Sequence, residues 1–471
     1  MNPANISTQK LDTIILQSLF AILNSNKVKY CIVNNYENLP EFIPSDVDIA
    51  IEPTSFKNID TFIAEIAKKH DVKIVQKIWH GYQKCAYILS PSCIDERFRL
   101  QLDFFTDFSA RGYPYLITHE QLLRERRPFK SFFIPSPDVE ALMLFMRRVI
   151  KNDIKTSHIM RMKFLYEMNP EDIEKTMLIC LGQKAWKNIT VLMTTGDAQI
   201  FNKNIKSYQR TLKFRSMKTA TFFYLLKYIG SQILRAFNRL LYPVGICVVF
   251  LGPDGSGKST IAKLVLERVS GSFHGSKIMY WRPNLLPMMG HLKLWAPTDD
   301  IVVNPDPHGH PKQGMMKSYV RFFYYLTDYI LGYVLKVYWS KVHKQIIIFD
   351  RYYYDYLVDL HRYRFNVPSW LPRFFLPLVP TPDIIVYLDA DPDVLEARKQ
   401  ELPKKELIRQ VGEYRKLISV LSKSHKINSN VPIETIVRRI STIVLETKAR
   451  QTAKTIGPHL KYGHPSTYEE K

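Results

Sequence analysis

Residues 252–260 of the 471-residue chain read GPDGSGKST, and the interpretation of the sequence starts from this stretch. It has the spacing G-x-x-x-x-G-K-[ST], in which glycines let the backbone turn tightly and turn its amide groups toward phosphate oxygens. Lys258 is then placed to reach the β- and γ-phosphates of a nucleotide, and Ser259 to contact Mg²⁺. The expected ATP-binding residues are Gly252, Asp254, Gly255, Ser256, Gly257, Lys258, Ser259 and Thr260.

The sequence around this glycine loop alternates between strand-like and helix-like segments. The apolar run ICVVFL at 246–251 precedes the loop, and the helical pattern IAKLVLERV follows it at 261–269. Two more apolar runs, QIIIFD at 345–350 and PDIIVYLDA at 382–390, are separated by helical segments such as the aromatic stretch at 315–339. This alternation favours an α/β domain over residues 244–446, with a parallel sheet and flanking helices.

The predicted strand at 345–350 ends in Asp350, and Arg351 follows it directly. In a fold with this loop, a carboxylate at the end of a neighbouring strand can hold Mg²⁺ opposite Ser259. Arg351 can project into the same cleft and bind a phosphate group through two parallel hydrogen bonds. The alternative is a surface ion pair between Asp350 and Arg351.

The stretches GPDGSGKST, FDRY at 349–352 and PDIIVYLDADPDVLEARKQE at 382–401 together resemble the thymidylate kinase-like branch of the P-loop kinases. The resemblance implies a kinase that uses ATP and Mg²⁺. Arg351 would then grip the acceptor phosphate, Asp350 would serve the magnesium site, and Arg398 would act from a lid-like segment. The catalytic residues that we expect are Lys258, Asp350, Arg351 and Arg398.

Other segments depart from the thymidylate kinase pattern and leave the acceptor open. Tyrosines follow FDRY closely, and the segments YWRPNLLP at 280–287, PDPHGHP at 305–311 and VDLHRYRF at 358–365 differ from a standard nucleoside monophosphate site. They resemble kinase-like proteins found with bacterial surface-polysaccharide synthesis. The expected acceptor is therefore a dTMP-like nucleotide or a sugar or glycolipid. Arg351, Tyr352 and Arg282 are the expected acceptor-binding residues; Arg282, Arg362 and Arg364 form an anion pocket or are ordinary surface charges.

The first 135 residues predict a separate α+β domain. Asp46 and Asp48 in SDVDIAIE alternate on one face of a predicted strand, and Asp103 in RLQLDFF can join them from another strand. Three converging carboxylates suit divalent metals, and the pattern resembles the nucleotidyltransferase superfamily. That family has Gly-Ser where this chain has Asn34 and Asn35. The resemblance therefore implies the nucleotidyltransferase fold more strongly than it implies nucleotidyl transfer.

Residues 136–243 are expected to be mostly helical. A helical extension at 136–215 leads into a basic amphipathic linker helix at 216–243, and no Asp or Glu occurs from 198 to 253. This helix either lies in the plane of an anionic membrane surface or packs on a neighbouring module. The polar residues 447–471 are expected to form a flexible tail.

The composition favours anionic partners and a cytoplasmic location. The formal net charge is +22, and the five cysteines lack metal-ligand spacing. Neither a signal sequence nor a spanning segment is apparent, so we expect a protein of the cytoplasm, with a peripheral position at the inner face of the membrane as an option. No nucleic-acid-reading module is visible. The leading hypothesis is an ATP-dependent phosphotransferase. The alternatives are a nucleotide-gated regulatory or membrane-associated protein and a nucleotidyltransferase acting through the N-terminal aspartates.

Overall fold

The structure is a computed structural model that describes residues 3–94, 97–110, 112–288, 314–398 and 402–456. The chain divides into two compact units. The N-terminal unit contains the described residues of 1–88 and 100–237 together with Ile456, and the C-terminal unit contains those of 89–99 and 238–455. The segment PDPHGHP at 305–311 lies outside the described residues.

The N-terminal unit is built on a five-stranded mixed sheet with the strand order β1-β2-β5-β4-β3. Strand β2 runs antiparallel to β1 and parallel to β5. The strands of this sheet are β1 (Tyr30–Ile32), β2 (Val47–Ile51), β3 (Val72–Gly81), β4 (Lys84–Pro91) and β5 (Leu100–Phe105). Two short hairpins add β6 (Phe108–Ala110) with β7 (Tyr113–Ile117) and β8 (Arg127–Phe129) with β9 (Phe132–Ile134).

Helices complete this unit. The first set is α1 (Pro3–Ser25), α2 (Pro53–Phe56), α3 (Ile59–Lys69) and α4 (His119–Leu123). The second set is α5 (Pro137–Lys151), α6 (Thr156–Met168), α7 (Pro170–Leu181), α8 (Gln183–Thr195), α9 (Ala198–Thr219) and α10 (Phe222–Leu241). The end of α10, residues 238–241, belongs to the C-terminal unit. Apolar side chains of α5 to α9 form one buried cluster with residues of β1, β2 and β5, which include Cys31, Ala50 and Phe105.

The basic segment at 216–243 is divided between two helices. Helix α9 continues to Thr219, Ala220 is extended, and α10 begins at Phe222. The hydroxyl of Thr221 accepts a hydrogen bond from the backbone N–H of Tyr224 at 3.3 Å, which satisfies one free amide at the start of the new helix. The expected single linker helix from 216 is therefore wrong at its N-terminal boundary.

The C-terminal unit contains a five-stranded, fully parallel sheet with the order β11-β12-β10-β13-β14. This confirms the prediction of a parallel sheet with flanking helices. The strands are β10 (Ile246–Leu251), β11 (Gly275–Tyr280), β12 (Gln345–Asp350), β13 (Ile384–Asp389) and β14 (Ser424–Asn428). The three central strands are apolar and fully buried over nearly their whole length, as expected for a sheet covered on both faces.

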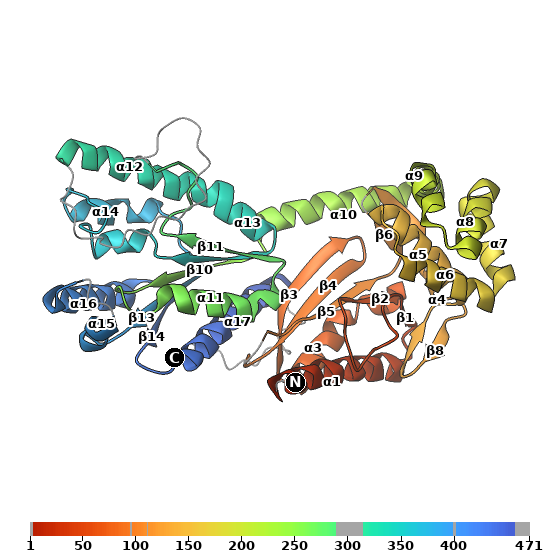
Figure 1. Cartoon of the computed structure of the whole chain (residues 1–471), viewed down its shortest axis with the longest axis horizontal. Coiled ribbons are helices and arrows are strands. Elements are labelled where there is room, and N and C mark those ends of the chain that lie inside the picture. Colours follow the sequence, from red (N-terminus) through yellow and green to blue (C-terminus); the bar gives the residue numbers. More distant parts are fainter. Residues whose placement is uncertain (1–2, 95–96, 111, 289–313, 399–401, 457–471) are drawn as a thin grey trace. The chain divides into compact units, whose positions relative to one another are not determined.

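Helices cover both faces of this sheet (Figure 1). The longer helices are α11 (Lys258–Val269), α12 (Met315–Gly332), α14 (Trp370–Phe375), α15 (Pro392–Arg398), α16 (Lys404–Val420) and α17 (Ile433–Ile456). Helix α12 continues through the π-helical turn η3 (Tyr333–Tyr338) into α13 (Trp339–Val342), and the short helices η1 (Ser270–Ser272), η4 (Tyr353–Leu357) and η5 (Leu376–Leu378) complete the unit. Figure 1 shows α12 and α14 on one side of the sheet and α11 and α17 on the other.

An aromatic core lies between the sheet and α12. Tyr329 on α12 meets Tyr352, Tyr353 and Tyr356 edge to face, with ring centroids 5.2, 5.5 and 6.1 Å apart. Such edge-on pairs add to the free energy gained from burial. The crowded tyrosines after FDRY therefore build the hydrophobic core next to the glycine loop.

The predicted flexible tail is wrong for its first ten residues. Residues 447–456 belong to helix α17, in which Lys448, Ala449 and Thr452 are buried. The sequence there is polar, but one face of the helix packs on the unit. The remainder of the predicted tail, 457–471, lies outside the described residues.

Candidate functional site

The glycine loop joins β10 to α11 and has the backbone that its glycines allow. Gly252, Gly255 and Gly257 have φ values of 149°, 83° and 86°. Residues that carry a Cβ atom rarely adopt φ values in this range. A Cβ atom at Gly252 would meet the Ser256 hydroxyl at 2.9 Å and the Leu388 carbonyl at 3.0 Å. The loop therefore needs glycine at this position for both conformation and space.

Lys258 is buried at the start of α11. Its ammonium group donates hydrogen bonds to the carbonyl oxygens of Gly252 at 2.8 Å and Pro253 at 2.7 Å. Burial, together with the nearby Arg351 guanidinium, lowers the pKa of Lys258 to about 8. The side chain is thus mostly protonated at neutral pH, and it lies within the loop where the helix N-terminus adds positive potential.

Ser259 and Asp350 face each other across neighbouring elements. The Ser259 hydroxyl donates a hydrogen bond to Oδ2 of Asp350. The other carboxylate oxygen, Oδ1, is buried and has no hydrogen-bond partner among the described residues. A hydroxyl and a carboxylate with an unpaired buried oxygen fit a Mg²⁺ ion, which is usually held by one or two protein oxygens together with phosphates and water. The pair is a suitable magnesium site.

Asp254, the third residue of the loop, lies between two arginines. It forms ion pairs with both Arg351 and Arg362, and all three side chains are at most 15% exposed. Burial alone would raise the pKa of the Asp254 carboxyl, but Arg351, Lys258 and Arg362 hold it well below its usual range. The carboxylate is therefore charged at any physiological pH and fixes both guanidinium groups beside the loop.

Arg351 has a second buried carboxylate partner. Its Nη1 lies 2.9 Å from Oδ2 of Asp355. The hydroxyl of Tyr363 donates to the same oxygen at 3.1 Å, and the hydroxyl of Tyr414 donates to Oδ1 of Asp355 at 2.9 Å. The backbone of Arg351 has a φ of 75° and donates to the carbonyl of Phe250 at 3.0 Å. A non-glycine residue held in this region is a common feature of functional sites.

The structure thus brings together most of the residues that the sequence assigned to this site: the glycine loop, Lys258, Ser259, Asp350 and Arg351. Two residues were not assigned. Asp355 has no role in the sequence-based prediction, and Arg362 appears there only as one of three arginines that form an anion pocket or lie on the surface. The Asp254 carboxylate in the loop was the available signal, because a buried acid requires cationic partners.

Two predicted acceptor-binding residues belong to the core instead. Arg282 is 1% exposed and pairs with Asp328, which is 0% exposed, at 2.7 Å; it also donates to the carbonyl of Leu286. Tyr352 is fully buried, and its hydroxyl donates to the carbonyl of Pro380 at 2.8 Å. Arg282 and Tyr352 are therefore part of the buried core in this structure, and a role for either in binding an acceptor stays a prediction.

Arg398, the predicted lid residue, lies at the end of α15 and is exposed. Its guanidinium donates a hydrogen bond to the carbonyl of Ser429 at 3.3 Å. The residues that follow it, 399–401, lie outside the described residues. The lid function of Arg398 stays a prediction.

The three N-terminal aspartates lie close together, and each carboxylate has a hydrogen-bond or ion-pair partner among the neighbouring side chains. Asp48 and Asp103 are opposite each other in the β2–β5 register. The side-chain amide of Gln101 donates to Asp46 at 3.1 Å and to Asp103 at 2.8 Å, and Arg147 pairs with Asp48 at 3.1 Å. In the part of the chain that the structure describes, no cluster of three metal-ligating His, Cys, Asp or Glu side chains is present. The expected metal site is therefore not found.

Asp103 should make stability depend on pH. Burial, with Asp48 and Asp46 nearby, raises the pKa of Asp103 to about 6 from 3.8, so stabilisation by its neutral form is present below pH 4 and lost as the pH rises through 6. Asp103→Asn cannot ionise and should be more stable than the wild type at pH 7 by about 1–2 kcal/mol. Urea unfolding at pH 4 and pH 7 checks this. An equal difference between the two proteins at both pH values would contradict it.

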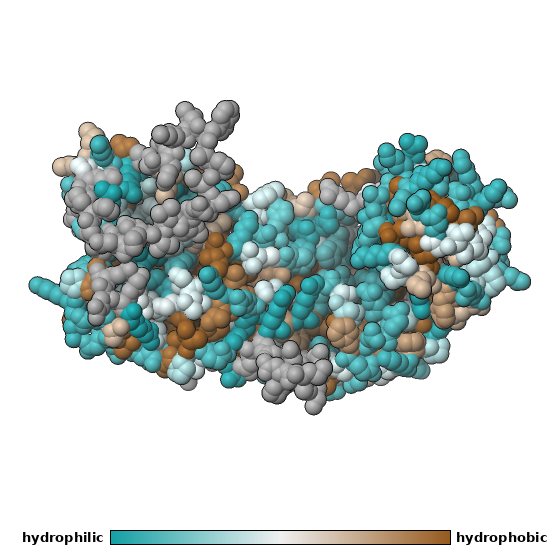
Figure 2. Space-filling view, viewed as in Figure 1, coloured by the Kyte–Doolittle hydropathy of each residue, from teal (hydrophilic) through white to brown (hydrophobic). Residues whose placement is uncertain are grey.

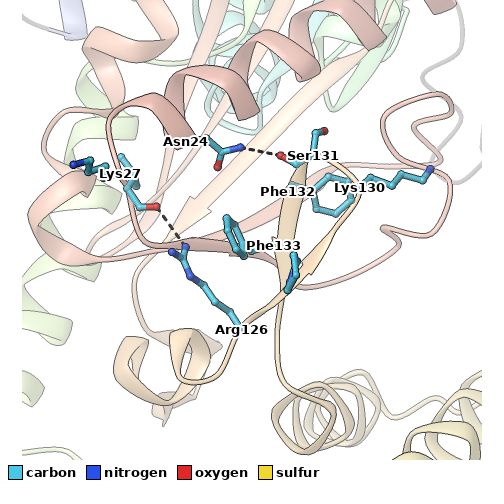
Figure 3. Close-up of a pocket in the computed structure, with 9 residues that line it drawn as sticks. Asn24, Lys27, Arg126, Lys130, Ser131, Phe132 and Phe133 are labelled. Atoms are coloured by element: carbon cyan, nitrogen blue, oxygen red, sulfur yellow. Dashed lines mark hydrogen bonds between the residues drawn. The ribbon is translucent and has the colours of Figure 1, made fainter.

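The N-terminal unit also contains a cavity of about 370 Å³, shown in Figure 3. Two of its three cationic side chains are engaged with the protein. Arg126 donates to the carbonyl of Tyr30 at 2.9 Å and lies over the Phe133 ring, while Lys130 donates to the carbonyl of Leu39 and the carboxylate of Glu41. These contacts hold the β8–β9 hairpin against the rest of the unit. We assign no ligand to this cavity.

The glycine loop between β10 and α11, in a parallel sheet whose next strand ends in Asp350, defines the C-terminal unit as a P-loop α/β fold. No known family model matches the chain. The chain is 24% identical over 222 residues to a protein of Malacoplasma penetrans (strain HF-2) described as a thymidylate kinase. This match covers 43% of the chain and 96% of that protein.

A comparison of structures gives a match with a deoxyadenosine kinase from M. mycoides with bound dATP. It covers 41% of this chain and 96% of that one, at 16% sequence identity and a TM-score of 0.28. The fold assignment rests on the sheet order and the loop described above. In sequence, the chain is distantly similar to a kinase over less than half of its length.

Proposed function

We propose that the C-terminal unit is an ATP-dependent phosphotransferase of the nucleoside monophosphate kinase-like class. The observation that carries the proposal is the convergence of Lys258, the Ser259–Asp350 pair and the Asp254-centred arginines around one glycine loop. The distant similarity to a protein named as a thymidylate kinase supports the same class.

In this proposal, the loop amides and the N-terminus of α11 bind the β- and γ-phosphates of ATP. Lys258 leaves the carbonyl oxygens of Gly252 and Pro253 and donates to phosphate oxygens, where its charge offsets the charge of the transferred group. Ser259 and Asp350 would hold Mg²⁺, which when bound neutralises charge on the phosphate oxygens. The acceptor oxygen forms a bond to the γ-phosphorus as the bond to ADP breaks.

Arg351 and Arg362 are the proposed acceptor-binding residues. Both guanidinium groups lie beside the loop and are charged, and planar guanidinium groups suit the two-point recognition of phosphate or carboxylate. Asp254 and Asp355 hold them in place before the acceptor binds. The acceptor class is accordingly an anionic or phosphorylated small molecule, either a dTMP-like nucleotide or a sugar or glycolipid of surface-polysaccharide synthesis.

An acceptor panel tests this function. The full chain is incubated with γ-labelled ATP, Mg²⁺ and, in parallel, nucleoside monophosphates, sugar phosphates and glycolipid extracts, and labelled products are identified. We expect one acceptor class to be labelled and the labelling to fall sharply in Arg362→Met, with Arg373→Met, an exposed arginine on α14, as the matched control. Saturable ATP binding without a labelled product in any arm would contradict the proposal and favour a nucleotide-gated regulatory protein.

A further inference from the structure

Helix α10 exposes its large apolar side chains. These side chains recur at helical spacing along one face, and no residue of the helix is buried. Their exposed fractions are 71% for Phe222, 74% for Phe223, 51% for Leu226, 53% for Ile229, 65% for Ile233 and 56% for Phe237. In most surface helices such a stripe faces the core.

The opposite face of α10 attaches the helix to the N-terminal unit. The hydroxyl of Tyr228 donates to the carbonyl of Ala110 at 3.3 Å, and Arg235 donates to the carbonyl of His80 at 2.7 Å. The Tyr224 ring packs on Tyr115 with centroids 4.6 Å apart. Polar and aromatic residues therefore make the contacts that a surface helix usually makes with its apolar stripe, and the stripe itself is turned outward.

The outward stripe is an exposed apolar surface. Figure 2 shows brown, hydrophobic residues on the upper side of the molecule near the end of α10 that adjoins α9. Helix α9 adds two exposed apolar side chains just before it, Phe214 at 71% and Met217 at 56%. Contiguous exposed apolar surface of this kind usually marks a site of interaction with a protein or a membrane.

The charge around this surface selects between those partners. Residues 198–253 contain nine basic residues and no Asp or Glu. On α9, the exposed members are Lys203, Lys206, Arg210, Lys213 and Lys218. A second copy of the chain would bring two such cationic surfaces together, which like-charge repulsion disfavours. The partner that complements the apolar stripe and its basic surroundings is a surface that is both apolar and negatively charged.

We propose that α10 is a membrane-surface helix that inserts its apolar stripe at the headgroup boundary of an anionic lipid bilayer, with the exposed basic residues of α9 near the lipid phosphates. Amphipathic helices with basic residues bind in this way, in the plane of the interface. Among the residues that the structure describes, no helix is long and apolar enough to cross a membrane. The inference concerns a surface separate from the glycine loop and is independent of the proposed phosphotransfer.

Vesicle flotation of the full chain tests the proposal. The probes are vesicles of phosphatidylcholine alone and of phosphatidylcholine with phosphatidylglycerol. We expect the chain to float with the anionic vesicles roughly tenfold or more better than with neutral ones, and less at high salt. The triple variant Ile229→Ser, Ile233→Ser, Phe237→Ser should lose this binding.

The matched control is the triple variant Ile179→Ser, Ile408→Ser, Val420→Ser, which replaces three exposed apolar residues outside α9 and α10. The side chains of Ile179, Ile408 and Val420 are 67%, 54% and 78% exposed. This variant should float with the anionic vesicles as the wild type does. Absence of vesicle binding, or equal binding by the wild type and the α10 variant, would overturn the proposal. The proposal would also be overturned if the chain bound no vesicles and light scattering showed a concentration-dependent dimer that only the α10 variant loses. A second copy of the chain would then cover the stripe. Absent vesicle binding with thermal destabilisation confined to the α10 variant would show that the chain itself covers it.

Discussion

Lys258→Ala is expected to lower γ-phosphoryl transfer by roughly 10²–10³-fold or more, the range seen when one preorganised donor to developing charge is removed. The ammonium group is buried within the loop, bonded to the carbonyl oxygens of Gly252 and Pro253. Because the phosphates would occupy this position, its loss removes the positive charge nearest to them. Initial rates of γ-label transfer at saturating ATP and acceptor measure the effect.

Lys263 provides the matched control for this variant. It lies on the same helix α11 but is exposed, so Lys263→Ala should keep the wild-type rate. The thermal midpoint of Lys258→Ala should stay near that of the wild type, because removing a desolvated cation offsets the loss of its two hydrogen bonds. Full activity in Lys258→Ala, with a folded protein, would remove the basis for assigning phosphotransfer to this loop.

The second large effect is on stability. Arg351→Met is expected to reduce the free energy of unfolding by about 3–5 kcal/mol, because it leaves buried carboxylates without their cation. Asp355 is 1% exposed, and Asp254 is 15% exposed with Arg362 as its remaining ion-pair partner among the described residues. Urea unfolding of the full chain, followed by a probe of the C-terminal unit, measures the change.

Two further variants separate charge from shape at this position. Arg351→Lys keeps a cation near Asp254 and Asp355, so it should lose much less stability than Arg351→Met while still impairing acceptor binding, because a single ammonium cannot reproduce the two-point contact. Arg373→Met, at an exposed arginine, should change the unfolding free energy little. If Arg351→Met proves no more destabilising than Arg373→Met, the buried ion-pair account is wrong.

The local part of the site could be predicted from sequence because its determinants are local. The glycines, Lys258 and Ser259 fall within one continuous motif whose backbone follows from the φ values that glycine permits. Asp350 could be placed because it ends a buried strand, and parallel strands end at the same edge of a sheet. The parallel sheet itself follows from apolar, β-branched runs that alternate with helices.

The remaining part of the site depends on partners far away in the chain. Arg362 meets Asp254 across 108 positions, and Arg282 meets Asp328 across 46. An arginine in a tyrosine-rich segment has the same local sequence whether it binds an acceptor or neutralises a buried carboxylate. The tertiary fold decides between these roles, which is why Arg282 was assigned to the acceptor and the contact of Arg362 with the loop was not foreseen.

Helix α10 illustrates a related limit. Its apolar stripe could be predicted from the spacing of its residues, but periodicity does not state which face packs. The contacts of Tyr228 with Ala110 and of Arg235 with His80 determine that the polar side faces the N-terminal unit. These contacts depend on carbonyl groups of β3 and β6, to which the sequence of α10 gives no clue.

Parallel reactions with γ-labelled and α-labelled ATP test the central claim most directly. The full chain is incubated with each label, Mg²⁺ and the acceptor fraction identified by the panel, and the labelled product is separated from ATP and ADP. The account predicts that only the γ label enters the product, because phosphotransfer at the Lys258 loop leaves the α-phosphate in ADP. Incorporation of the α label would instead indicate nucleotidyl transfer and would contradict the account.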